Sequence, residues 1–74
     1  MEKYQVLIGT GVSRMVAERA VMGLVNEMGL HAERRLLNSV DTNYTYEVYL
    51  TKKYAVNVVR YASAFVDGVK WAMR

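Results

Sequence analysis

The sequence predicts a small α+β domain with the element order β-α-β-β-α. Three observations support this prediction. A β-branched, apolar run occupies residues 3–9, apolar residues recur at helical spacing over about 12–28 and 52–73, and apolar and polar residues alternate in YTYEVYL, residues 44–50. The 74 residues contain no repeat, linker or low-complexity stretch, so we expect one domain.

The first strand, KYQVLIG, is expected to end at Gly9, with a tight turn over Gly9–Gly11 leading into the first helix. Ser13 is the expected N-cap, because its hydroxyl can accept a hydrogen bond from an unpaired backbone N–H. Gly29 is the expected helix stop, since glycine can adopt a positive φ. The apolar face of this helix is predicted to contain Ala17, Ala20, Val21, Leu24, Val25 and Met28.

Residues 31–51 are predicted to form a β-hairpin. The period of two places Tyr44, Tyr46, Val48 and Leu50 on one face, and Thr45, Glu47, Tyr49 and Thr51 on the other. A three-residue turn at DTN, residues 41–43, would pair Leu36 with Val48 and Arg35 with Tyr49.

The second helix is predicted over residues 52–73, with Thr51 as its N-cap. Its expected core face contains Ala55, Val58, Ala62, Phe65, Val66, Val69 and Met73.

A right-handed crossover between the first two strands lets the third strand insert between them. The favoured arrangement is therefore a sheet of order 1-3-2 with both helices on one face, and order 1-2-3 is the alternative. This topology resembles the ferredoxin-like βαββαβ motif without its last strand. The resemblance is one of topology only, so it implies a fold and no function.

Composition limits the classes of function. Hydrophobic residues make up 53% of the chain, there is no cysteine, and His31 is the only histidine, so we expect no disulfide and no metal site. The start of the chain does not resemble a signal peptide, and no apolar run has the roughly 18 residues of a membrane span. We therefore expect a cytoplasmic protein that does not enter membranes.

Catalytic patterns are also missing. His31 has no partner evident from the sequence, the carboxylates are scattered, and no serine has a base at a recognisable spacing. We expect no enzyme activity and no cofactor.

One alternative is a small phosphorylated ligand bound at the glycine-rich loop. Gly9, Gly11, Ser13 and Arg14 would hold the anion at the N-terminus of the first helix. The dinucleotide motif G-x-G-x-x-G fails here, because Arg14 stands where its third glycine would be.

The favoured hypothesis is a non-enzymatic binding module that acts through protein–protein contacts, with a partner of unknown identity. Candidate contact residues are Met15, Arg19, Met22, Arg60 and Trp71. As a small protein without cysteine, the chain resembles the accessory and inhibitor proteins of phages and mobile elements, although no sequence motif supports this resemblance.

A second alternative is nucleic-acid binding. The formal net charge is +3, and a surface with Arg34, Arg35, Tyr49, Lys52 and Lys53 would combine phosphate contacts with base stacking.

Homodimerisation is expected through the first strand. In a 1-3-2 sheet this strand is an edge, and an unpaired edge invites pairing with another chain. The predicted contact runs from Tyr4 to Ile8 and includes Val6 and Leu7, with the two copies antiparallel about a two-fold axis.

Overall fold

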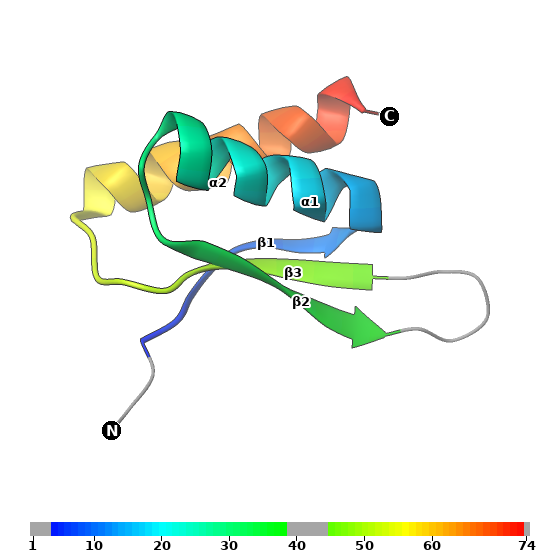
Figure 1. Ribbon diagram of the computed structural model, residues 1–74, viewed down its shortest axis with the longest axis horizontal. Helices are drawn as coiled ribbons and strands as arrows, with labels where there is room; N and C mark the ends of the chain where they lie inside the picture. The colour runs from blue at the N-terminus through cyan, green and yellow to red at the C-terminus, as the bar shows by residue number, and fades with distance from the viewer. Residues whose placement is uncertain (1–3, 39–44, 74) are drawn as a thin grey trace.

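The computed structural model describes residues 4–38 and 45–73, and it confirms the predicted order of elements (Figure 1). The elements are β1 (Val6–Val12), α1 (Arg14–Met22), the π-helical turn η1 (Gly23–Glu27), β2 (Ala32–Asn38), β3 (Thr45–Leu50) and α2 (Val56–Ala72). The strands form one antiparallel sheet of order β1-β3-β2, as predicted.

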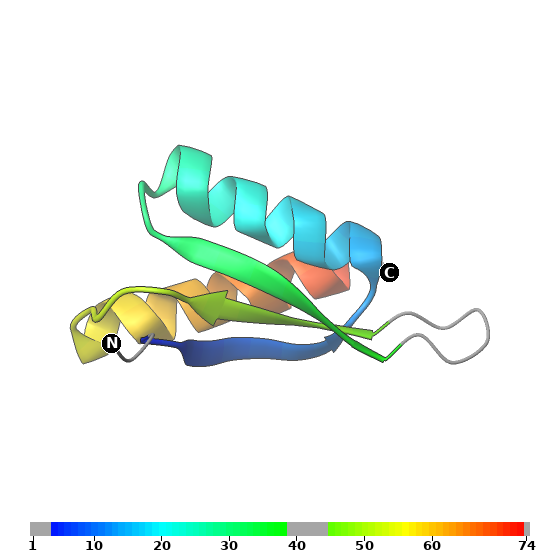
Figure 2. The same ribbon diagram turned by 60° about the horizontal axis from the view of Figure 1, so that its bottom comes forward.

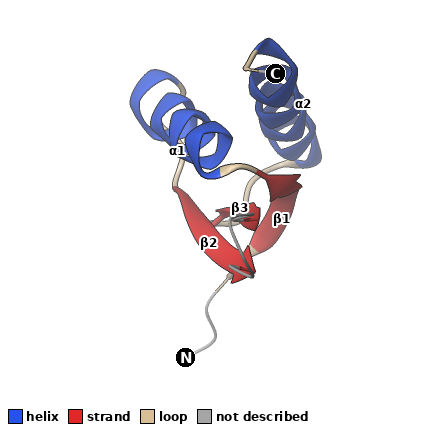
Figure 3. Cartoon of the chain, turned by 90° about the vertical axis from the view of Figure 1, so that its right-hand side faces the viewer, coloured by secondary structure: helices blue, strands red, loops and turns tan. Residues whose placement is uncertain are grey.

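The fold has two layers. Both helices lie on one face of the sheet (Figure 3). Helix α1 contacts β2 and β3, while α2 contacts β1. Figure 2 shows the twist of the sheet, with β3 as its central strand. The opposite face of the sheet carries no helix in the described part of the chain.

The hydrophobic core lies between the two layers. Leu24, Val48 and Leu50 are fully buried there. The other buried apolar residues come from β1 and both helices: Ile8, Val12, Val16, Ala17, Ala20, Ala62 and Val66. Full burial of a side chain of this size contributes roughly 1.5–3 kcal/mol to the free energy of folding. The predicted alternation in β3 is confirmed at Val48 and Leu50, whereas Tyr44 lies outside the described residues.

The predicted turn at Gly9–Gly11 is wrong, because β1 continues through both glycines to Val12. The register runs from Leu7 opposite Tyr49 to Gly9 opposite Val48, and then to Val12 opposite Tyr46. Each step inserts one extra residue into β1, which is the definition of a β-bulge. Gly11 has φ +65°, a conformation that suits glycine within a bulge. The strand can therefore carry Val12 into the core.

The first helix begins and ends as predicted, but its course differs. Ser13 is the N-cap and accepts a hydrogen bond from the backbone N–H of Val16 at 3.3 Å. Gly29 comes after the helix with φ +69°. Between these points the π-helical turn η1 adds a residue to the turn and rotates the later side chains about the helix axis. The placement of Val25 in the core is consequently wrong, since it is 41% exposed.

The predicted hairpin register is wrong by two residues. Arg34 pairs with Val48, Arg35 with Glu47, and Leu36 with Tyr46. The prediction assumed a three-residue turn, but residues 39–44 separate β2 from β3. The predicted turn, residues 41–43, lies outside the described residues. A shift of two preserves the period of the strand, so the side chains up to Leu36 keep their predicted face, and a register irregularity follows between Leu36 and Asn38.

Thr51 is not the cap of α2, which begins four residues later than predicted. The backbone N–H of Thr51 donates to the carbonyl oxygen of His31 at 2.9 Å, and the His31 N–H donates to the Tyr54 hydroxyl at 2.8 Å. These bonds hold residues 51–54 beside the start of β2. Ala55 is the N-cap and makes no side-chain hydrogen bond.

Two adjacent residues of α2 determine where that helix packs. A Cβ atom on Gly9 would lie 2.6 Å from Cγ1 of Val66, and one on Gly23 would lie 2.3 Å from Cζ of Phe65. A side chain at either position would force Val66 or Phe65 to shift. Val66 therefore packs directly on β1, and Phe65 packs directly on the first turn of η1.

The contact between Gly9 and Val66 gives a testable prediction. Gly9→Ala should lower the free energy of unfolding by about 1–3 kcal/mol, because a β-branched valine in a helix cannot rotate away from the added methyl group. Gly68→Ala is the matched control. A Cβ at Gly68 meets nothing within 4 Å, so alanine should raise the free energy of unfolding by about 0.5–1 kcal/mol. Urea denaturation measures both, and equal changes in the two variants would contradict this packing.

Candidate functional site

The strongest candidate site is a groove between the two helices, on their side away from the sheet. Phe65 of α2 packs against Gly23 at the start of η1. Around this contact lies a groove of about 660 Å³. Arg19 and Met22 line it from α1, while Phe65, Gly68, Val69 and Met73 line it from α2. We call it the interhelical groove.

Gly68 leaves a gap in the wall of the interhelical groove. It lies in the interior of α2, where glycine costs roughly 0.5–1 kcal/mol relative to alanine. No atom lies within 4 Å of the place where its Cβ would be. Unlike Gly9 and Gly23, this glycine makes room for no other part of the described chain. The sequence signal for the site was an isolated glycine within a helical pattern, and the predictions from the sequence did not include it.

Two residues of opposite charge line the groove on the side formed by α1 and η1. Arg19 lies in the last turn of α1, and Glu27 lies at the end of η1, eight residues later. Between them lie Met22, which is 59% exposed, and the polar Asn26. The groove therefore offers a mainly apolar surface with a cation toward one end, an anion toward the other and one side-chain amide between them.

Of the five predicted partner-binding residues, the groove brings together Arg19 and Met22 only. Met15 and Trp71 are also exposed, at 66% and 62%, but neither lines the groove. Arg60 is exposed on α2, closer to the start of that helix. Phe65, Gly68 and Met73 complete the site, although helical spacing predicted only a core role for Phe65 and Met73.

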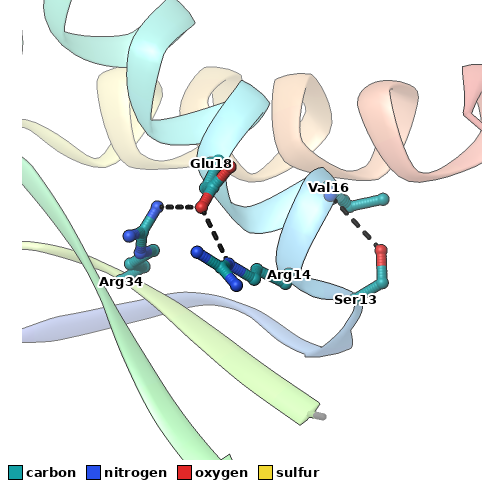
Figure 4. A network of polar contacts seen from close by, with 5 residues as sticks. All are labelled: Ser13, Arg14, Val16, Glu18 and Arg34. Carbon is teal, nitrogen blue, oxygen red and sulfur yellow. Dashed lines mark hydrogen bonds and ion pairs between the residues drawn. The ribbon is translucent and has the colours of Figure 1, made fainter. Parts of the chain in front are cut away.

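The predicted anion-binding residues have other partners in the structure (Figure 4). The Ser13 hydroxyl caps α1. Nε of Arg14 lies 3.1 Å from Oε1 of Glu18, and Nη1 of Arg34 lies 3.0 Å from the same oxygen. Gly9 is covered by Val66. Nothing in this geometry tests phosphate binding, which stays a prediction, but both side chains proposed for it already have protein partners.

The five residues of the nucleic-acid alternative do not share one face. Arg34 lies on the helix side of the sheet, where it contacts Glu18, whereas Arg35 lies on the open side opposite Glu47. Tyr49 is also on the open side. Lys52 and Lys53 are exposed in the segment after β3. Each arginine thus has a carboxylate beside it, and nucleic-acid binding stays a prediction.

A polar cluster on the open face of the sheet alters the acidity of Tyr49. The Tyr49 hydroxyl donates a hydrogen bond to Oε1 of Glu47. This hydrogen bond raises the pKa of Tyr49, with smaller contributions from burial and from the charge of Glu47; Arg35 acts in the opposite direction. Tyr49 therefore stays protonated at neutral pH and serves as a hydrogen-bond donor.

Strand β1, which contains most of the predicted dimer contact, is an edge strand of the sheet. Strand β1 pairs with β3 on one side, and no described strand pairs with its other side. Tyr4 and Leu7 are exposed, Val6 is partly buried and Ile8 is buried. Leu7 lies opposite Tyr49 on the open face, as predicted.

Two other kinds of feature, a metal site and a membrane-spanning helix, are not found among the described residues. No group of three His, Asp or Glu side chains in residues 4–38 and 45–73 could hold a metal ion. Over those same residues, neither helix is both long enough and apolar enough to cross a membrane. The comparisons with protein-family models, with curated proteins and with solved structures found no match.

The cluster on the open face predicts a change in titration. Glu47→Gln should lower the pKa of Tyr49 toward the ordinary tyrosine value of about 10, because the phenol loses a charged acceptor. The folded state holds this proton more tightly than the unfolded state. The resulting stabilisation is therefore present below pH 10 and is lost as the pH rises through the raised pKa.

NMR titration of the Tyr49 ring carbons measures this change. Glu33→Gln is the matched control, because Glu33 lies opposite Tyr49 and the structure shows no hydrogen bond between them. A Tyr49 pKa that is unaffected by Glu47→Gln would contradict the assigned hydrogen bond.

Proposed function

We propose that this protein is a non-enzymatic binding module that acts through protein–protein contacts and works as a homodimer. The observation that carries the proposal is the open space over Gly68 in the interhelical groove. A glycine in a helix interior lowers stability, and here no contact within the described chain offsets that cost. A side chain from another protein would supply the missing contact.

The chemistry of the groove favours an amphipathic helix as the bound segment. Helix-in-groove recognition uses apolar side chains at helical spacing against an apolar floor. Arg19 and Glu27 lie eight residues apart on one wall, which is about two helical turns. A complementary helix would place a large apolar residue over Gly68, an acidic residue beside Arg19 and a basic residue beside Glu27.

Exposed methionines support the same proposal. Met22 lines the groove, and Met15 lies two turns earlier on α1. Methionine side chains are flexible and polarisable, so they adapt to the shape of a partner. Trp71 is also exposed, but it comes four residues after Asp67 and so lies toward the outer side of α2, away from the groove.

The proposal predicts that filling the groove separates binding from folding. Gly68→Leu should keep or raise thermal stability, since leucine is a better helix former than glycine and the space is open. The same variant should lose at least roughly 90% of the partner captured by a tagged copy of the protein from its native host, a loss of about tenfold in affinity. Quantitative mass spectrometry of the captured proteins measures the loss.

Leu37→Gln, a change at an exposed β2 residue that does not line the groove, is the control and should capture the same proteins as the unmodified chain. A photo-crosslinking residue at Met22 should also attach to the captured partner, whereas one at Leu37 should not. Equal capture by the Gly68→Leu variant, with no crosslink from position 22, would refute the groove as the binding site.

A further inference from the structure

We propose that two copies of this chain pair through the outer edge of β1, and that the same two-fold axis sets Arg60 on one α2 helix against the partner subunit's Asp67. This inference rests on the homodimer of the proposed function and gives that dimer an interface. It involves the opposite side of α2 from the interhelical groove, so the two sites can be tested separately.

The two edges of the sheet differ in charge. Strand β2 forms one edge and carries Glu33, Arg34 and Arg35 in succession. Charged side chains on an edge strand discourage pairing with another sheet. Strand β1 forms the other edge, and residues 4–12 contain no charged residue. Of the two edges, β1 is therefore the one suited to accept a second strand.

The bulges in β1 limit where that second strand can pair. Register irregularities come after Leu7 and Gly9, so the later half of β1 departs from regular strand geometry. Bulges on an edge strand twist the edge and end pairing. Regular pairing is available only before them, which places the contact at about Tyr4–Leu7, where Tyr4 and Gln5 would extend β1 ahead of its first residue, Val6. Identical strands that pair about a two-fold axis must run antiparallel.

A cleft of about 330 Å³ lies between the later half of β1, from Ile8 to Val12, and the outer side of α2. Thr10 lines it from β1, while Ser63, Ala64, Asp67 and Lys70 line it from α2. The outer side of α2 therefore borders the free edge of the sheet, and a copy that pairs with β1 comes close to this helix.

The charges on the outer side of α2 are self-complementary under that symmetry. Strand β1 and α2 run in the same direction (Figure 1). Antiparallel pairing of two β1 strands therefore makes the two α2 helices antiparallel as well. Arg60 and Asp67 are both exposed and lie seven residues, or about two turns, apart on one face. A two-fold axis midway between them brings each arginine opposite the partner subunit's Asp67.

One axis can serve both contacts. The midpoint between Arg60 and Asp67 falls at Ser63 and Ala64, just before Val66, and Val66 packs on Gly9. The regular part of β1 likewise lies just before Gly9. The centres of the strand contact and the helix contact therefore lie at a similar level along the molecule. Ala64 is small and exposed at that level, which lets two helices approach closely.

The strand contact is tested by molar mass from light scattering across a wide range of protein concentration. The unmodified chain should reach twice the 8.5 kDa of one copy. Leu7→Lys should raise the dimer dissociation constant about tenfold or more, because two like charges then face each other across the axis. Leu37→Lys makes the same change at an exposed leucine of the other edge strand, β2, and should leave the dissociation constant unchanged.

The helix contact is tested by charge reversal. Asp67→Arg alone should raise the dissociation constant about tenfold, since it places arginines against one another across the axis. Combining it with Arg60→Asp exchanges the two charges and should restore dimerisation. Circular dichroism confirms that each variant stays folded.

Several results would overturn the interface. These are a monomer at every concentration, a dimer indifferent to Leu7→Lys, equal weakening by Leu37→Lys, or failure of the double charge exchange to restore the dimer that Asp67→Arg removes. A monomer that still captures its partner through the interhelical groove would refute this interface while leaving the partner-binding function in place.

Discussion

Two neighbouring side chains of α2, each packed against a glycine, set the geometry on which the rest of this molecule depends. Val66 packs on Gly9 in the sheet, and Phe65 packs on Gly23 at the start of η1. Because adjacent residues on a helix point about 100° apart, these two contacts fix both the position of α2 over β1 and its rotation about its own axis. A chain of this length buries only about 60% of its unfolded surface, so few other contacts could hold the helix in place.

The functional surfaces result from this placement. Phe65 packs against Gly23, and the space over Gly68 one turn later stays open as the interhelical groove. Since Val66 holds α2 above β1, the outer side of that helix borders the free edge of the sheet. Groove and edge thus lie on opposite sides of one helix. The two proposed contacts, with a partner in the groove and with a second copy at the edge, therefore do not overlap.

Periodicity alone was sufficient for the architecture. The alternation in YTYEVYL and the two helical stripes predicted the element order, and the handedness of the crossover favoured the 1-3-2 sheet. The errors arose where a distant residue decides the local structure. Gly9 and Gly11 look like a turn, yet Val66 covers Gly9 from 57 positions away in the sequence, and β1 continues past both. Thr51 looks like a helix cap, but its N–H bonds to His31.

The candidate site was predictable only in part. Met22 was recognisable as a contact residue because helical spacing placed it off the core stripe. The role of Gly68 was not recognisable, because a glycine that accommodates a packed side chain and one that leaves open space look alike in a sequence. That Phe65 and Val66 fix α2 through two glycines can be measured directly by NMR in solution. We expect intense nuclear Overhauser effects between the Val66 methyl groups and the Gly9 Hα protons, and between the Phe65 ring protons and the Gly23 Hα protons. Weak or absent effects at both glycines, in a protein whose β1–β3 pairing is intact, would show that α2 packs elsewhere and would contradict this placement of the helix.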